Sequence, residues 1–148
     1  MFLERAGSGR LGEPAYAALL GFRDGDPERN LQTIGDRLPF EVLERFRRNA
    51  GFSRAQMSIL MQMTDRALAL RRKEGCFRLD ESARLRRAAR AFGSALELFD
   101  GEAAAAREWL VSPQLALGGE VPLHLVGTES GSREVEVAIG RIEQGVYG

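Results

Sequence analysis

Between Pro39 and Val111 the chain has almost no proline and few glycines, and its apolar residues recur at helical spacing. Proline and glycine are the strongest interrupters of regular structure, so their scarcity favours uninterrupted elements. Apolar residues at i, i+3 and i+4 form one face of a helix that can be buried. This stretch therefore predicts a run of helices, and the 148-residue chain is expected to be an all-α protein.

Start and stop signals divide this run into five predicted helices. Ser53 and Gln56 form a capping box, in which the hydroxyl and the amide each satisfy a backbone donor at a helix start. Thr64 is a good N-cap for the following helix, and Gly75 closes that helix. The expected spans are about 40–49, 53–61, 65–74, 80–99 and 102–110. The second and third helices, joined by a tight turn and preceded by another helix, form a helix-turn-helix.

The chain beyond Pro113 predicts two further helices. Pro122 suits the first turn of a short helix, and Gly131 is expected to separate that helix from the next one. The last helix carries an apolar stripe at i, i+4, i+7 and i+11, made of Val135, Ile139, Ile142 and Val146. We expect this stripe to be core or a dimer contact, with contact to another protein as the alternative. The charged residues off the stripe remain available to a partner: Glu134, Glu136, Arg141 and Glu143.

Residues 1–36 contain repeated glycines and prolines around one apolar patch, Tyr16 to Phe22. This composition predicts a loose arm with one short helix. The expected organisation is an arm (1–36), a helix-turn-helix domain (37–100) and a C-terminal helical domain (101–148).

The net charge is distributed unevenly although the whole chain is neutral. Residues 37–92 hold fourteen of the 21 basic residues and six acidic ones, a net charge of +8, so the remainder carries −8. Such asymmetry is typical of a protein in which one part meets a polyanion and another part meets something else. The alternative is a solvated basic helix surface.

The side chains that could support catalysis are few. One histidine, His124, and one cysteine, Cys76, cannot build a Cys/His metal cluster, and no phosphate-binding loop or nucleophile elbow surrounds them. We therefore expect no metal, no cofactor, no catalytic residue and no enzyme. The longest apolar run, Ala15 to Leu20, is far shorter than the roughly 20 residues that span a bilayer. The start lacks the layout of a secretory signal, so we expect a cytoplasmic protein.

The helix-turn-helix predicts a DNA reader, because a recognition helix presents its first residues to base edges while flanking residues hold phosphates. Thr64 and Arg66 occupy that leading turn, and the planar fork of Arg66 matches the two major-groove acceptors of guanine. The residues expected to contact phosphates are Arg54, Gln56, Arg71, Arg72 and Lys73. Recognition of two half-sites predicts a symmetric homodimer on operator DNA.

The motif resembles the phage-repressor or Xre class of helix-turn-helix in the residues at Gln56, Leu60, Met63, Thr64 and Leu68. Two residues depart from that pattern. Gln62 stands where a turn glycine is usual, and Leu70 stands where relatives commonly carry an arginine. A non-glycine residue at positive φ costs about 1 kcal/mol, so this turn is open to remodelling.

The end of the chain carries an ordered set of motifs: Trp109-Leu110, Pro113, Leu117-Gly118-Gly119, Pro122-Leu123, Thr128-Glu129, Gly131, Val135-Glu136 and residues 140–148. Together with the helix-turn-helix, this set resembles the Xre/MbcA/ParS family of antitoxins over about Leu38 to Gly148. The resemblance implies an N-terminal Xre-like helix-turn-helix domain followed by a small helical domain for toxin binding and dimerisation.

The resemblance also implies a partner and a role. The partner is a cognate RES-domain toxin, similar to ADP-ribosyltransferases, that degrades NAD or transfers ADP-ribose. Such an antitoxin binds the toxin near the entrance of its NAD site and represses its own operon through the helix-turn-helix. The expected toxin-binding residues are Glu136, Arg141, Glu143, Val146, Tyr147 and Gly148. The alternative is a stand-alone helix-turn-helix regulator whose C-terminal domain only dimerises.

Overall fold

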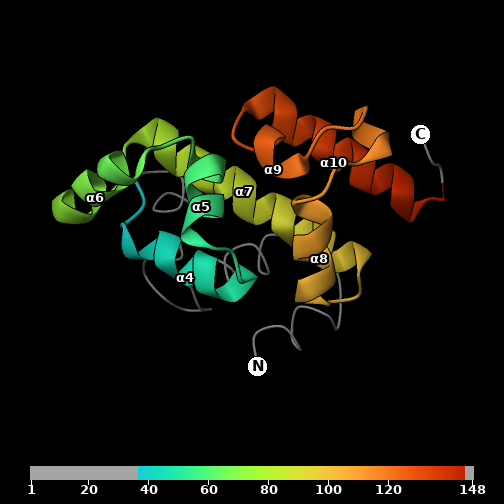
Figure 1. The fold of residues 1–148 in the computed structure, drawn as a ribbon, viewed down its shortest axis with the longest axis horizontal. Helices are drawn as coiled ribbons and strands as arrows, with labels where there is room; N and C mark the ends of the chain where they lie inside the picture. Colours follow the sequence, from blue (N-terminus) through green and yellow to red (C-terminus); the bar gives the residue numbers. More distant parts are fainter. Residues whose placement is uncertain (1–36, 146–148) are drawn as a thin grey trace.

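The computed structural model describes residues 37–145, and every regular element within that range is helical, which confirms the all-α prediction. The predicted N-terminal arm lies outside the described residues. Figure 1 shows the order of the helices. They are α4 (Glu41–Ala50), α5 (Arg54–Met61), α6 (Asp65–Glu74), α7 (Leu79–Leu98), α8 (Ala103–Leu110), the 3-10 turn η2 (Leu115–Leu117), α9 (Pro122–Leu125) and α10 (Glu129–Glu143).

The helix boundaries follow the capping residues that the sequence predicts. The Ser53 hydroxyl accepts the Gln56 backbone N–H at 3.1 Å, and the Gln56 amide oxygen accepts the Ser53 N–H at 2.8 Å. The Thr64 hydroxyl accepts the Ala67 N–H at 3.0 Å and so starts α6. Gly51 and Gly75 end α4 and α6 in the left-handed conformation. Each of these bounds lies within about one residue of the prediction.

Helix α7 is the longest element, with 20 residues, and both parts of the molecule pack on it. Helices α4 and α5 contact α7, and α8 and α10 contact it as well. In Figure 1 the α4–α6 group lies beside the first half of α7 and the α8–α10 group beside its second half. The expected boundary at residue 100 thus falls just after a helix that the two groups share.

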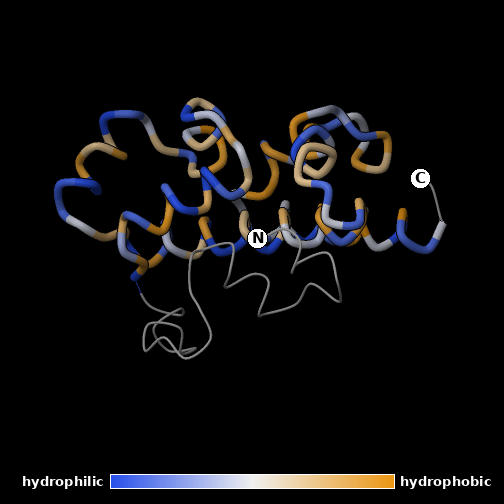
Figure 2. Tube along the Cα trace, turned by 90° about the horizontal axis from the view of Figure 1, so that it is seen from below, coloured by the Kyte–Doolittle hydropathy of each residue, from blue (hydrophilic) through white to orange (hydrophobic). Residues whose placement is uncertain are grey.

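An aromatic cluster anchors α4 and the loop after it to α7. The rings of Phe46, Phe52 and Phe92 are all almost fully buried, with centroids 5.8 to 6.1 Å apart in edge-on arrangements. Aromatic pairs in this geometry contribute about 0.5–1.5 kcal/mol each beyond the burial of their area. In Figure 2 apolar and polar residues alternate along the helices, as expected when each helix buries one face.

The prediction that Gly131 separates two helices is wrong. Gly131 lies in the first turn of α10, and its N–H donates to the hydroxyl of the N-cap, Thr128, at 3.0 Å. A Cβ at position 131 would collide with the carbonyl oxygen of Leu125 at the end of α9. The glycine therefore serves close packing between α9 and α10, and Thr128 starts the last helix.

The apolar stripe of α10 faces the core as predicted for its first members. Val135 and Ile139 are buried and Ile142 is partly buried, whereas Val146 lies outside the described residues. The turn η2 was not predicted. It packs near α10, and its ends are joined by the bridge between Gln114 and Glu120. Within residues 37–145 no helix has the length and apolar character needed to cross a membrane.

Candidate functional site

The turn between α5 and α6 keeps the geometry of a helix-turn-helix without the usual glycine. Gln62 adopts the left-handed conformation, with φ 57° and ψ 40°, and its N–H donates to the carbonyls of Ser58 and Ile59. The Met63 N–H also donates to the Ser58 carbonyl, at 3.1 Å. The Ser58 hydroxyl then donates to the Asp65 carboxylate across the turn, at 3.1 Å. Gln62 therefore adopts the positive φ that a glycine usually supplies, and the turn keeps the ordinary helix-turn-helix geometry.

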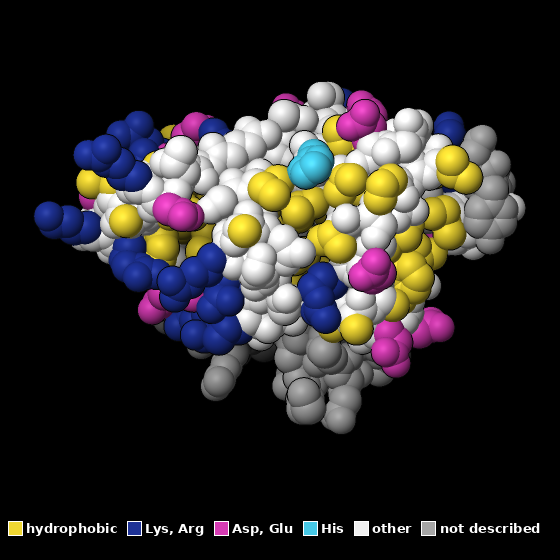
Figure 3. Space-filling model, viewed as in Figure 1, with side chains coloured by type: hydrophobic (Ala, Val, Ile, Leu, Met, Phe, Trp, Pro, Cys, Tyr) yellow, Lys and Arg dark blue, Asp and Glu magenta, His cyan; other side chains and the backbone are white. Residues whose placement is uncertain are grey.

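The outward face of α6 presents Arg66, Leu70 and Lys73. These positions are four and three residues apart, so they align on one side of a helix. Arg66 and Lys73 are exposed, and 48% of Leu70 is exposed. Leu68, by contrast, packs against the core. Figure 3 shows Lys and Arg side chains gathered over the α4–α6 end of the molecule.

The side chain of Arg72 is held on the flank of α6 by two contacts. Its guanidinium lies 5.3 Å from the centroid of the Phe40 ring, and its Nη2 lies 3.8 Å from Glu44 Oε2. Arg54, the first residue of α5, is exposed, and Gln56 is partly buried in its capping box. Arg54 and Arg72 line one groove between α4, α5 and α6. Five predicted DNA-contact residues thus lie at the surface of two neighbouring helices: Arg54, Gln56, Arg66, Arg72 and Lys73.

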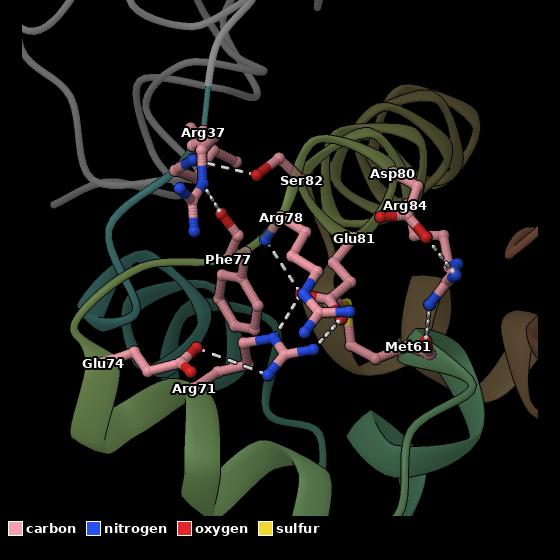
Figure 4. Close-up of polar contacts among 11 residues, drawn as sticks. Arg37, Met61, Arg71, Glu74, Phe77, Arg78, Asp80, Glu81, Ser82 and Arg84 are labelled. Atoms are coloured by element: carbon pink, nitrogen blue, oxygen red, sulfur yellow. Dashed lines mark hydrogen bonds and ion pairs between the residues drawn. The ribbon is translucent and has the colours of Figure 1, made fainter.

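Arg71 does not join this surface, contrary to its expected role as a phosphate contact. It is 5% exposed, and its Nε and Nη2 donate to the two carboxylate oxygens of Glu81 at 2.8 and 2.9 Å. Figure 4 shows this pair beneath α7, with Glu74 on the other side of the guanidinium. The spacing of basic residues could not reveal this, because Arg71 lies on the inner face of α6 while its neighbours lie outside.

The ion pair moves the pKa values of both partners toward the charged forms. Burial alone would raise the pKa of Glu81, but hydrogen bonds from Arg71 and from the Arg78 backbone N–H outweigh it, so that pKa is lowered. The hydrogen bond to Glu81 raises the pKa of Arg71. The same Glu81 oxygen that Arg71 binds also caps the start of α7. This carboxylate therefore fixes the inner face of α6 to α7.

Two arginines of α7 donate to backbone carbonyls of other elements, so their side chains are not simply part of a solvated basic helix surface. Arg84 donates to the Met61 carbonyl at 2.7 Å, at the end of α5, as Figure 4 shows. Arg87 donates to the Gly127 carbonyl at 2.7 Å, and burial lowers the pKa of Arg87. Gly127 also lies against Gln62, because a Cβ there would be 2.7 Å from Gln62 Nε2. The turn of the helix-turn-helix and the loop after α9 are thus joined directly.

Of the predicted partner residues in α10, Arg141 and Glu143 are exposed. Glu136 is not available in the same way, because the Ser94 hydroxyl of α7 donates to its carboxylate at 2.6 Å. Burial raises the pKa of Glu136, with a partial offset from that hydrogen bond. Glu136 remains partly exposed, so its contact with a toxin stays a prediction, although its carboxylate already accepts one hydrogen bond within the chain. The other predicted contacts, Val146, Tyr147 and Gly148, lie outside the described residues.

The C-terminal helices also expose two large apolar side chains that the sequence did not single out. Leu115, in η2, is 94% exposed, and Val137, in α10, is 49% exposed. Figure 3 shows apolar side chains on this end of the visible face, in contrast to the basic end. A leucine this exposed in a one-turn element makes little contribution to the core, and exposed apolar groups often mark binding surfaces. In the sequence, the only sign that Leu115 lies in an irregular, exposed segment is the pair of glycines that follows it, Gly118 and Gly119.

Comparisons with known proteins agree with the earlier resemblance. The family model described as the antitoxin Xre/MbcA/ParS C-terminal toxin-binding domain matches residues 94–145, which include the end of α7, α8, η2, α9 and α10. A protein named Antitoxin Xre from Photorhabdus laumondii is 30% identical over 114 residues, covering 76% of this chain and 77% of that protein. A protein of the same name from Yersinia enterocolitica is 33% identical over 108 residues, covering 72% and 73%.

Proposed function

The chain belongs to the Xre/MbcA/ParS family of antitoxins, and from this premise we propose that it neutralises a toxin by direct contact through its C-terminal helices. It acts by binding in the cytoplasm, and no catalytic role is assigned to any of its residues. The observation that carries the proposal is the exposed Leu115 within the segment that matches the toxin-binding domain.

The proposed toxin-binding surface combines apolar and charged groups. Leu115 in η2 and Val137 in α10 supply apolar area that loses contact with water on binding, whereas Arg141 and Glu143 supply exposed charged groups on α10. Interfaces of this kind gain most of their affinity from a few buried anchors, with polar groups around them. Leu115 is the best anchor candidate because nearly all of its side chain is open to a partner.

Replacement of Leu115 by Arg tests this surface in cells that also express the cognate toxin. We expect the variant to fold, since the residue is 94% exposed, and to lose protection against the toxin. Leu79→Arg is the matched control, because Leu79 is also exposed, at 61%, but lies at the start of α7 near the helix-turn-helix. Full protection by Leu115→Arg, at equal protein levels, would contradict the proposed surface.

We propose further that the toxin has a RES domain and consumes NAD or transfers ADP-ribose from it. The resemblance in the C-terminal motifs supports this assignment, and Val146, Tyr147 and Gly148 are the proposed residues at the mouth of the toxin's NAD site. Removal of residues 146–148 tests the second point. We expect cellular NAD to fall when the toxin is expressed with the shortened chain and to hold with the full chain. Unchanged NAD would remove these three residues from the mechanism.

A second proposed activity is repression of the chain's own operon by a homodimer on DNA. Arg66 is the proposed base reader at the leading turn of α6, next to Thr64, and the proposed phosphate contacts are Arg54, Gln56, Arg72 and Lys73. The exposed basic surface supports this role, since DNA binding depends on neutralising phosphates. Arg71 is left out of the proposed contacts because Glu81 already holds its guanidinium.

Arg66→Ala separates the two activities. The variant is expected to lose repression of a reporter driven by the upstream DNA, because a bidentate arginine contact contributes about 1–3 kcal/mol of base discrimination. It should still protect cells from the toxin. A chain that represses this promoter but leaves the toxin active would instead be the stand-alone regulator.

A further inference from the structure

Leu70 is a large apolar side chain in a basic row on the outer face of α6. Its exposed fraction is 48%, and Arg66 and Lys73 lie one helical turn before and after it. The two neighbours that point inward are Leu68, which packs on the core, and Arg71, which binds Glu81. Leu70 is therefore not needed to hold α6 in place, and a partner of α6 meets it between two cations.

The order of charge along this row limits the class of partner. A protein surface that buries Leu70 has to desolvate or pair the two flanking cations, which is costly without matching anions. The major groove of DNA supplies anionic phosphates at its edges and acceptor atoms on its floor. It also offers one apolar group there, the C5-methyl of thymine. A row of cation, leucine and cation matches that pattern.

We infer that Leu70 contacts the C5-methyl group of a thymine in the operator and makes that base pair part of the sequence that the chain prefers. This inference rests on the proposed DNA binding and adds a specificity-determining residue to it. Arg66 and Leu70 are separated by about 6 Å along the helix axis, because each residue rises about 1.5 Å. Base pairs are spaced by about 3.4 Å, so the thymine lies one to two base pairs from the base that Arg66 reads.

The test compares the full chain with Leu70→Ala on duplexes from the DNA upstream of its gene. Each thymine in the protected site is replaced in turn by deoxyuridine, which lacks only the C5-methyl group, and affinity is measured by fluorescence anisotropy. At one thymine the wild-type chain should lose about fourfold in affinity, the factor expected for one buried methyl group. Leu70→Ala should bind both duplexes equally at that position.

Leu79→Ala is the matched control, since it also shortens an exposed leucine but lies outside α6. It should retain the fourfold response of the wild-type chain. If the chain prefers its own promoter but Leu70→Ala keeps the same response to every replacement, the inference about Leu70 is overturned and DNA binding stands.

Other outcomes also separate the two proposals. If the chain binds promoter and unrelated duplexes equally in dilute salt, the proposed operator recognition fails and the inference fails with it. If Leu70→Ala changes the mass of the protein in solution while the response to deoxyuridine is unchanged, Leu70 belongs to a contact between protein chains. That outcome overturns the inference as well.

Discussion

Two glutamates, one where α7 meets the α4–α6 group and one in the α8–α10 group, have pKa values shifted in opposite directions. Glu81, in the first turn of α7, receives two hydrogen bonds from Arg71 of α6 and one from the Arg78 backbone, and its pKa is lowered. In the α8–α10 group the carboxylate of Glu136 meets a serine hydroxyl, and burial raises its pKa. At the first site an arginine is used inside the chain to fix α6 to α7, while at the second the carboxylate accepts a hydrogen bond from Ser94 and has a raised pKa.

This difference matches the demands of the two proposed tasks. A recognition helix has to present side chains at fixed positions, because a small displacement breaks hydrogen bonds to base edges. A surface that buries apolar side chains against a protein tolerates more adjustment, since the hydrophobic effect is not directional. The ion pair between Arg71 and Glu81, which holds α6 to α7, therefore lies in the half of the molecule whose proposed task needs rigidity.

The largest expected effect comes from breaking that ion pair. Glu81→Ala leaves the buried Arg71 guanidinium with Glu74 as its remaining ion-pair partner, which should lower the free energy of unfolding by about 3 kcal/mol, the lower end of the cost of breaking a buried pair. Urea unfolding measures the loss. The double variant Arg71→Met, Glu81→Leu removes both charges and should recover much of it. A loss below about 1 kcal/mol in the single variant would contradict the assigned role.

A smaller loss is expected in the other group from Gly131→Ala. The new methyl group collides with the Leu125 carbonyl, and overpacking of this kind costs about 1–3 kcal/mol. Gly140→Ala is the control in the same helix, because a Cβ at that position meets no atom within 4 Å. It should raise stability by about 0.5–1 kcal/mol through helix propensity. Thermal unfolding of both variants would show whether α9 and α10 need close contact.

The basic surface should respond to salt, one residue at a time. Lys73→Ala removes one proposed phosphate contact and should reduce the slope of log affinity against log salt by about 0.9. Titrations of promoter DNA at several salt concentrations measure this slope. Arg133→Ala is the control, since Arg133 is exposed on α10 and pairs with Glu129. An equal change in slope for both variants would contradict the proposal that DNA binds at the α4–α6 end and not at the α8–α10 end.

The smallest expected effect is the pH dependence of the two glutamates. Glu81 has a lowered pKa, so it stabilises the fold above the ordinary glutamate pKa of about 4.3 and loses this effect as pH falls through its folded pKa. Glu136 has a raised pKa, so its favourable contribution exists at low pH and is lost as pH rises through its folded pKa.

Glu136→Gln keeps an acceptor for the Ser94 hydroxyl and removes the titration. The variant should match or slightly exceed the wild-type stability at pH 7, and its relative gain should vanish near pH 4. Unfolding curves at both pH values give the comparison. The raised pKa of Glu136 would be contradicted if the variant gained stability over the wild-type chain at pH 4 but not at pH 7.

The sequence predicted the helices well where short-range chemistry decides the boundary. The capping residues Ser53, Thr64 and Gly75 act within three or four residues, so they can be identified without knowledge of the fold. Gly131 misled the prediction because the Leu125 carbonyl that requires a glycine is brought to it only when α9 packs on α10. A breaker and a close-contact glycine look the same in the sequence.

The exposure of the candidate site residues was predicted where it follows from helical position and missed where a partner lies far along the chain. Arg66 and Lys73 face outward as their spacing suggests. Arg71 and Glu136 were assigned to partners, but Glu81 and Ser94 bind them from α7. Periodicity gives the face of a residue but not the distant group that meets it there. The contacts of Arg84 with Met61 and of Arg87 with Gly127 were missed for the same reason.

The continuity of α7 constrains how such a molecule can change during evolution. This helix runs without interruption from the α4–α6 group to the α8–α10 group. Its arginines bind the end of α5 on one side and the loop after α9 on the other. One residue inserted in it turns everything beyond by about 100° and advances it by about 1.5 Å. The angle between the proposed toxin surface and the proposed DNA surface can thus be altered only in coarse steps, unless the contacts that the α7 arginines make are rebuilt too.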